Sequence, residues 1–239
     1  MLDVERIETY RGTLKVLRGV SVHVGAAESV ALVGRNGAGK TTTIETIMGL
    51  LPARAGAVNF QGKPITRIPA YQRARLGIGY APEDAGLFPD LTVAEHFHMC
   101  EWLTPATRAG AGNDGRGNVE ASIFSIFPEV SACLQRRGLH LSGGQKKMVA
   151  VARAMALSPS ILLLDEPFEG LAPVVVSRLI EAVRQIKSMG ISLLIAESNL
   201  TNAIRMADRL YAIDRGEIIF AGTPSRAQAD ENVMRTLRG

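Results

Sequence analysis

Short apolar stretches separated by glycine-rich turns follow one another along most of this chain. Val20, Val22 and Val24 alternate with polar residues, which predicts a strand with one buried face. Residues 30–33 are apolar without interruption, which is typical of a strand buried on both faces. The same reasoning predicts further strands at residues 58–60, 78–81, 161–164, 192–196, 210–213 and 217–221.

Segments with helical periodicity lie between these strands. Residues 40–48 are expected to form a helix that ends at Gly49. A second segment has apolar residues at helical spacing along one face, namely Val176, Leu179, Ile180, Val183 and Ile186. Strands that alternate with helices in this way predict an α/β fold with a mostly parallel sheet.

Residues 91–156 have a different pattern, dominated by helical signals. Thr92 and Glu95 have the spacing of a capping box, so a helix is expected to begin there. Beyond it we expect a flexible loop, glycine-rich and polar, and then two short helices separated by Pro128, at residues 109–118, 119–127 and 130–136. We interpret residues 91–156 as a helical subdomain inserted into the α/β core.

Composition places the chain among ordinary globular proteins. Its 239 residues, 46% of them hydrophobic, can bury one full core, and we treat 1–239 as a single domain. No apolar run approaches the roughly 20 residues of a membrane span. Charged residues stand where a signal peptide requires an apolar core, at Asp3, Glu5, Arg6 and Glu8. The net charge of +4 is small and the basic residues are scattered, so the charge discriminates little between partners. We expect no nucleic-acid partner.

The loop after residues 30–33 has a sequence suited to binding phosphate. It fits the pattern G-x-x-x-x-G-K-[ST], in which glycines let backbone N–H groups approach a nucleotide's phosphates. Lys40 is expected to reach the β- and γ-phosphates, and Thr41 to place its hydroxyl on Mg²⁺. A glycine-rich turn without a ligand is the alternative, which the preceding strand and following helix disfavour. The candidate nucleotide-binding residues are Gly34, Asn36, Gly37, Ala38, Gly39, Lys40, Thr41 and Thr42.

Two carboxylates end the apolar run at 161–164. Asp165 is expected to hold Mg²⁺, directly or through water, and Glu166 to polarise the attacking water as a general base. A structural pair is the alternative, but buried carboxylates at a strand end are costly without a cation. We therefore favour a catalytic interpretation for this pair.

Between these motifs lies a second glycine-rich turn, Leu141-Ser142-Gly143-Gly144-Gln145. Ser142 would serve as an ordinary N-cap in any case. A hydroxyl and two glycines at a helix start also offer donors and a positive dipole to a phosphate. The position of the whole string between the other two motifs favours the second interpretation.

In this order, the three motifs resemble the ATP-binding cassette (ABC) family. The resemblance covers essentially the whole chain and implies a P-loop NTPase core with an N-terminal antiparallel β region and an inserted helical subdomain. It also implies ATP and Mg²⁺ as cofactors and an ATPase coupled to transport. Ser142, Gly143, Gly144 and Gln145 would then act in trans, facing the γ-phosphate bound to a second ABC ATPase subunit in a head-to-tail dimer.

The chain resembles most closely the ATP-binding subunits of bacterial importers for branched-chain amino acids, and of related amide or urea importers. The supporting phrases are Leu17-Arg18-Gly19-Val20-Ser21, Ala81-Pro82-Glu83, Leu87-Phe88-Pro89, Asp165-Glu166-Pro167, Gly170-Leu171-Ala172-Pro173 and Ala207-Asp208-Arg209. The short segment after Gly216 suits the shorter of the two ATPase chains that such importers carry, which implies a heterodimer. Membrane permease subunits and, indirectly, a periplasmic solute-binding protein would complete the importer, with this chain peripheral on the cytoplasmic face of the bacterial inner membrane.

Several positions depart from the family's usual pattern. Glu83 stands where most cassettes have a Gln that contacts Mg²⁺ and water, and a carboxylate can still bind the metal. Ser198 replaces the switch His, and a neutral hydroxyl is a weaker partner for the γ-phosphate. Ala172 falls where many cassettes have an Asp that links the two sites. For adenine stacking, either Tyr10 or Arg11 is available.

Two other classes of function remain as alternatives. A soluble ABC protein of translation or DNA repair would usually carry two cassettes or long coiled-coil insertions, and neither pattern is present in this sequence. A P-loop kinase or switch GTPase is disfavoured by residues 141–145, which precede the Asp165–Glu166 pair. The expected function is therefore the ATPase subunit of a membrane importer.

Overall fold

The computed structural model describes residues 1–103 and 113–238. A six-stranded sheet has the order β10-β9-β3-β8-β7-β6. All neighbouring strands in it run parallel except the pair formed by β9 and β10, which is antiparallel. Its strands are β3 (Ser29–Val33), β6 (Ile78–Ala81), β7 (Ile161–Asp165), β8 (Ser192–Glu197), β9 (Arg209–Asp214) and β10 (Glu217–Gly222).

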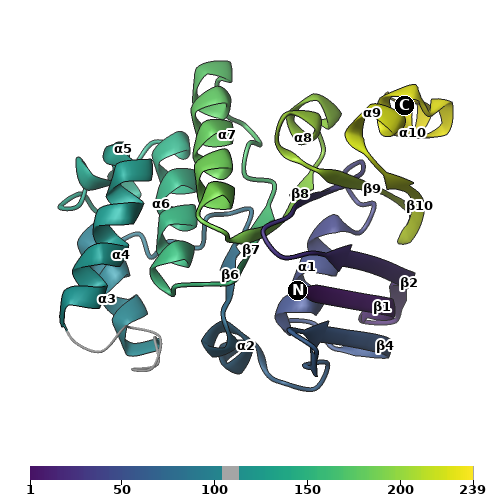
Figure 1. Cartoon of the computed structure of the whole chain (residues 1–239), viewed down its shortest axis with the longest axis horizontal. Coiled ribbons are helices and arrows are strands. Elements are labelled where there is room, and N and C mark those ends of the chain that lie inside the picture. The colour runs from purple at the N-terminus through teal and green to yellow at the C-terminus, as the bar shows by residue number, and fades with distance from the viewer. Residues whose placement is uncertain (104–112, 239) are drawn as a thin grey trace.

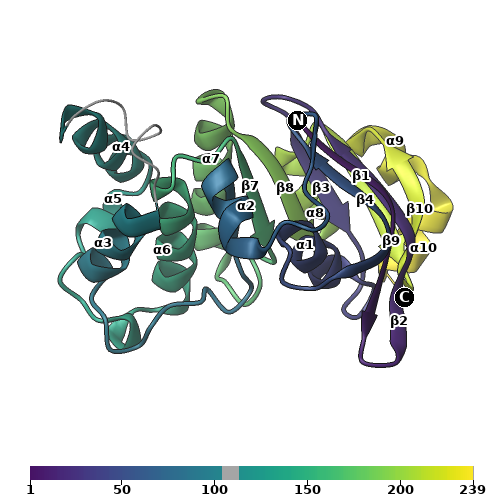
Figure 2. The same ribbon diagram turned by 90° about the horizontal axis from the view of Figure 1, so that it is seen from below.

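A smaller, antiparallel sheet of order β2-β1-β4-β5 is built from the N-terminal part of the chain. Its strands are β1 (Leu2–Arg11), β2 (Leu14–Val24), β4 (Ala53–Phe60) and β5 (Lys63–Pro64). Helix α1 (Lys40–Met48) packs against strands of both sheets, and Figure 2 shows it in that position. This arrangement confirms the α/β fold with an antiparallel N-terminal region.

The remaining helices cover the six-stranded sheet and extend one end of the molecule. Figure 1 shows α3 to α6 gathered beside β6 and α7, with α9 and α10 at the opposite end of the sheet. Helix α8 packs on the central strands β3 and β8. Their bounds are α2 (Ala70–Leu76), α3 (Val93–Leu103), α4 (Asn113–Ile126), α5 (Pro128–Ser131), a 3₁₀ turn (Gly138–His140), α6 (Gly143–Ala156), α7 (Pro173–Ser188), α8 (Leu200–Met206), α9 (Pro224–Ala229) and α10 (Glu231–Arg238).

Every side chain of β3, β7 and β8 is buried, on both faces of the sheet, which explains the uninterrupted apolar runs. In β3, Val30 and Leu32 join the core that contains α1, whereas Ala31 and Val33 face a small core that contains α8 and α9 residues. β7 alternates in the same way, and its Leu164 faces the largest core. The period-2 alternation of strand side chains thus places each strand in two cores at once.

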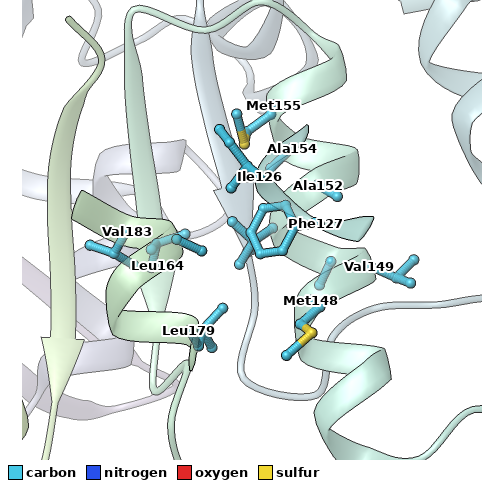
Figure 3. Close-up of a cluster of buried hydrophobic side chains, with 14 of the residues drawn as sticks. Ile126, Phe127, Met148, Val149, Ala152, Ala154, Met155, Leu164, Leu179 and Val183 are labelled. Carbon is cyan, nitrogen blue, oxygen red and sulfur yellow. The ribbon is translucent and has the colours of Figure 1, made fainter. Parts of the chain in front are cut away.

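The largest core joins the helices at residues 91–156 to the sheet. Figure 3 shows Phe127, which lies between α4 and α5, packed between side chains of α6 such as Met148 and residues of α7 and β7 such as Leu179 and Leu164. Phe127, Leu164 and Leu179 are fully buried. This packing fixes the helix that begins with the 142–145 turn against the strand that carries Asp165.

Three expectations for this region were wrong. Residues 109–112 lie outside the described part, but residues 113–118, expected as loop, begin α4. The apolar residues further along α4, among them Ile123 and Ile126, are buried in the core, and this packing stabilises a helix whose first turns have low intrinsic propensity. Pro128 starts α5 rather than separating two helices, since proline fits the first helical position. Residues 132–136, expected as helix, are turns.

Candidate nucleotide-binding and hydrolytic site

The phosphate-binding loop is a tight turn between β3 and α1. Gly37 and Gly39 have φ of 81° and 114°, in the left-handed region that favours glycine. At Gly34 a Cβ atom would lie 2.5 Å from the Ile213 carbonyl oxygen, so only glycine allows the loop to lie this close to β9. The loop lines a cavity of about 690 Å³ through Asn36, Gly37, Gly39, Lys40, Thr41 and Thr42.

Lys40 is held inside this loop by its own side-chain bonds. Its Nζ donates to the carbonyl oxygens of Gly34 and Arg35 at 2.7 and 3.0 Å. The same ammonium lies 2.9 Å from Glu166 Oε1, and both side chains are 5% exposed. A buried cation thus joins the phosphate loop to the carboxylate that directly follows β7.

Asp165 stands at the end of β7 with the chemistry of a metal ligand. Its Oδ1 accepts a hydrogen bond from Thr41 Oγ1 at 3.1 Å, and its buried Oδ2 has no hydrogen-bond partner among the described residues. Burial, reinforced by the nearby Glu166 and Glu83, raises the pKa of Asp165 to about 6, although the Thr41 bond acts against this. An unpaired buried carboxylate oxygen beside a threonine hydroxyl fits a divalent cation such as Mg²⁺.

Glu166 follows directly and adopts a left-handed backbone with φ of 44°. Its carboxylate is held by three groups: the Lys40 ammonium, the Ser198 N–H at 3.0 Å, and the Ser198 hydroxyl, which contacts Oε1. Ser198 Oγ also lies 3.2 Å from Asn36 Oδ1. The structure therefore brings the predicted base, the switch position and the phosphate loop into direct contact.

A further carboxylate, Glu197 at the end of β8, was missed by the sequence analysis. It is 2% exposed, its Oε1 accepts from the Asn199 N–H at 2.8 Å, and its Oε2 has no partner in the described part of the chain. Burial is the main cause that raises its pKa to about 7, and the charge of Glu166 adds to the effect. The signal was available, since Glu197 ends the apolar run at 192–196 just as Asp165 ends the run at 161–164.

In the described part of the chain, four basic side chains besides Lys40 also line the cavity. Arg11 lines it, with Nε donating to Thr42 Oγ1 at 3.3 Å and the guanidinium paired with Glu45. Tyr10 is not among the lining residues of this cavity. The other lining residues there, which the sequence analysis did not single out, are Leu14, Lys15, Val16, Arg18 and Arg215.

Glu83 and Glu169 also line this cavity. The Glu83 main-chain carbonyl accepts a hydrogen bond from Lys147 Nζ at 2.7 Å. Of the predicted metal-binding set, Thr41 and Glu83 line the cavity. Asp165 is not a lining residue, but it is in direct contact with Thr41.

The 142–145 turn lies elsewhere and does not line this cavity. Ser142 caps α6: its Oγ accepts from the Gln145 N–H at 3.3 Å, and Gln145 Oε1 accepts from the Ser142 N–H at 3.0 Å. Both Ser142 and Gly143 are exposed. Ala172, at the N-cap position of α7, is also exposed and makes no side-chain capping bond.

Comparisons with known proteins agree with this geometry. A model of the ABC transporter family matches residues 17–169. The chain is 32% identical over 223 residues to the high-affinity branched-chain amino acid transport ATP-binding protein BraG of Pseudomonas aeruginosa, with 93% of each chain covered. It is 34% identical over 243 residues to the lipopolysaccharide export system ATP-binding protein LptB of Haemophilus influenzae, with 100% of this chain and 97% of the other covered.

A solved structure gives the same result. The ADP conformation of MJ1267, an ATP-binding cassette of an ABC transporter, matches with a TM-score of 0.83 at 28% identity, covering 100% of this chain and 98% of that one. The fold and site define a nucleotide-binding P-loop protein, and the chain belongs to the ABC transporter family. It is an ATPase of that family, which confirms the resemblance carried by the three motifs. No helix in the described part of the chain is long and apolar enough to cross a membrane.

Proposed function

We propose that this chain is the ATP-hydrolysing subunit of an importer for branched-chain amino acids. The identity of 32% to BraG, which extends over 93% of both chains, supports this cargo. Short sequences outside the three main motifs also support this cargo. One of them is Gly170-Leu171-Ala172-Pro173, which resembles the sequence of the ATPase subunits of such importers. The separate membrane permease subunits and a periplasmic solute-binding protein would select the solute. The chain would work peripherally on the cytoplasmic face of the inner membrane.

The hydrolytic assignment is carried by one observation, the meeting of Lys40, Glu166 and Ser198 beside the phosphate loop. In this proposal the loop N–H groups and Lys40 bind the β- and γ-phosphates of ATP. Thr41 and Asp165, with Glu83, would hold Mg²⁺, which when bound neutralises charge on the phosphate oxygens.

Glu166 would accept the proton of the water that attacks the γ-phosphorus, because its carboxylate is fixed at the cavity wall. The Ser198 N–H and hydroxyl orient that carboxylate, and Lys40 balances its charge. Glu197, buried behind this cluster, would add negative charge near Glu166 when it ionises. Lys40 belongs to the first motif and Glu166 to the third, whereas Glu197 ends β8 and Ser198 follows it directly.

The second half of the site would come from another chain. Ser142, Gly143, Gly144 and Gln145 lie outside the cavity and two of them are exposed, which supports an action in trans on ATP held by a second ABC ATPase subunit. Such an arrangement requires a head-to-tail dimer. Because Ser198 replaces the switch His and Ala172 the linking Asp, we propose a heterodimer in which the partner carries the faster site.

Arg11 is the better candidate for contact with adenine. Its guanidinium lines the cavity and is held in place by Glu45 and Thr42, so a planar cation is ready to stack on a purine. Tyr10 is absent from the cavity lining, which supports Arg11 over Tyr10.

A second cargo is favoured by a specific comparison. The chain is as similar to LptB of Haemophilus influenzae as to BraG, at 34% identity over its whole length. Lipopolysaccharide export is therefore the second candidate, while a urea or amide importer remains a variant of the first. The ATPase chemistry described above would be common to all three.

Reconstitution separates these cargoes. The chain would be purified with the membrane proteins encoded beside it and placed in proteoliposomes, with the matched periplasmic binding protein added. We expect leucine-loaded binding protein to stimulate ATP hydrolysis and to drive ATP-dependent leucine uptake, both lost in Glu166→Gln. Stimulation by lipopolysaccharide instead of leucine would assign the chain to export, and stimulation by urea alone would assign it to the amide branch.

A further inference from the structure

Two basic side chains of α6 hold the loop that follows β6. Lys147 Nζ donates to the Glu83 carbonyl at 2.7 Å. One turn and a half further along, Arg153 donates to the carbonyls of Gly86 and Ala85 at 2.7 and 3.2 Å. Ala85 has φ of 64°, a left-handed backbone for a residue with a Cβ. These bonds fasten residues 83–86 to the helix that begins with the 142–145 turn.

Lys147 also reaches across to the hydrolytic strand. Its Nζ donates to the Glu166 carbonyl at 2.6 Å. On the other side, the Glu166 N–H donates to the Ala196 carbonyl of β8 at 3.0 Å. The main chain of Glu166 is thus held from β8 and from α6 at once, in a left-handed conformation of φ 44° that few non-glycine residues adopt.

The Lys147 ammonium lies among carboxylates but is bonded to carbonyl oxygens. Burial lowers its pKa, while the charges of Glu169, Glu83, Glu166 and Asp165 act in the opposite direction. No salt bridge of Lys147 to a carboxylate is present in the described part of the chain. Its two bonds therefore fix main-chain geometry rather than neutralise one particular charge.

We propose that Lys147 is a positioning residue for hydrolysis, which aligns the Glu166 carboxylate by tying its main chain and the 83–86 loop to α6. The inference rests on the proposed role of Glu166 as the base. Movement of α6, which carries the turn that faces a partner's ATP, would then change the alignment of Glu166 in this chain's own site. Lys147 would make hydrolysis depend on how α6 is docked.

The test is Lys147→Met, which keeps the length of the side chain and removes both bonds. Loss of a charge-assisted hydrogen bond from the transition state alone corresponds to roughly 10- to 150-fold in kcat. We expect a loss of at least tenfold, with KM for ATP and nucleotide affinity unchanged within about twofold. Lys63→Met, on the exposed strand β5, makes the same chemical change away from the site and should keep parent kinetics.

A double variant distinguishes positioning from a general loss of structure. If Lys147 acts through Glu166, adding Lys147→Met to Glu166→Gln should lower kcat no further, whereas independent effects would multiply. Two outcomes would overturn the role of Lys147 but leave that of Glu166 intact. In the first, Lys147→Met turns over at the parent rate while Glu166→Gln is slow. In the second, the losses of the two single variants multiply in the double variant. Parent turnover in Glu166→Gln would overturn both assignments.

A second substitution covers the case in which Lys147→Met fails to bind nucleotide. Lys147→Gln retains a single donor of shorter reach, and we expect it to bind ATP normally with a reduced kcat. Normal turnover in that variant contradicts the proposal, because one shorter donor cannot hold the Glu83 and Glu166 carbonyls together.

Discussion

Glu197 provides a direct measure of the electrostatics around the hydrolytic site. Its carboxyl group is buried, one of its oxygens is unpaired among the described residues, and it titrates near Glu166 and Lys40. Glu197→Gln replaces it with a neutral group of nearly the same shape. The variant therefore removes one titration from the folded protein while leaving the packing almost unchanged.

The expected magnitude follows from the pKa of Glu197, which burial raises from 4.5 to about 7. Between these values the folded state binds a proton that the unfolded state has released, so the free energy of unfolding of the parent falls as pH rises. At about 1.4 kcal/mol for each pH unit, the full loss is about 3 kcal/mol. It is absent below pH 4.5 and complete above pH 7.

Urea denaturation of both proteins, without nucleotide, at several values between pH 5 and pH 8 tests this. The stability of Glu197→Gln relative to the parent should increase by about 2–3 kcal/mol across that range and level off above pH 7. Asp165 titrates in both proteins, so its contribution cancels in the difference. A difference that does not change with pH would show that Glu197 is ionised throughout and that its burial is compensated by groups other than those described.

Four further substitutions test the site. Lys40→Ala should weaken Mg-ATP binding by at least tenfold in a fluorescent-nucleotide assay, because a charged partner of the phosphates is lost. Glu166→Gln should bind ATP normally but hydrolyse it about 10²-fold more slowly or worse in a phosphate-release assay. Ser142→Trp should leave ATP binding to the monomer intact and abolish ATP-dependent dimerisation, measured by light scattering with the partner subunit. Ser198→His should raise hydrolysis at this chain's own site in the complete transporter by roughly 10- to 150-fold, if the missing bond supports the transition state.

Each of these variants can fail in an informative way. Normal ATP affinity in Lys40→Ala would mean that the loop is not the phosphate site, and parent turnover in Glu166→Gln would place the base elsewhere. Loss of monomer binding in Ser142→Trp would mean that Ser142 contacts its own nucleotide. An unchanged, high rate in Ser198→His would show that Glu197, Ser198 or Asn199 already supplies the contact in the parent.

The local sequence predicted the bounds of an element correctly where glycines mark its ends. The helix Lys40–Met48 was expected with these bounds, and glycines in the left-handed conformation, Gly39 and Gly49, flank it in the structure. In contrast, β1 was not expected as a strand, because a bulge at residues 5–6 shifts its alternation: Leu2 and Val4 are buried before it, and Ile7 and Thr9 after it. A one-residue shift of register hides a strand from a period-2 pattern.

The site was predictable where its chemistry is contiguous in sequence. The phosphate loop and the Asp165–Glu166 pair are each a short continuous stretch of sequence that directly follows a predicted strand. Lys147 gave no such signal, since a lysine on an amphipathic helix is ordinarily a solvated side chain. Only the fold brings it to the carbonyls of Glu83 and Glu166, which lie 64 and 19 positions away along the chain.

The capping bond at Ser142 uses only part of the hydrogen-bonding capacity of its hydroxyl group. A hydroxyl has lone pairs that accept and one proton that it donates, and the bond from the Gln145 N–H uses only an accepting lone pair. The proton remains available and can rotate about the Cβ–Oγ bond towards solvent, where the exposed side chain points. Holding the helix and meeting a phosphate from another subunit are therefore compatible tasks for one oxygen atom. In the proposed head-to-tail dimer, α6 would therefore keep its N-terminal cap while Ser142 contacts the other subunit's nucleotide.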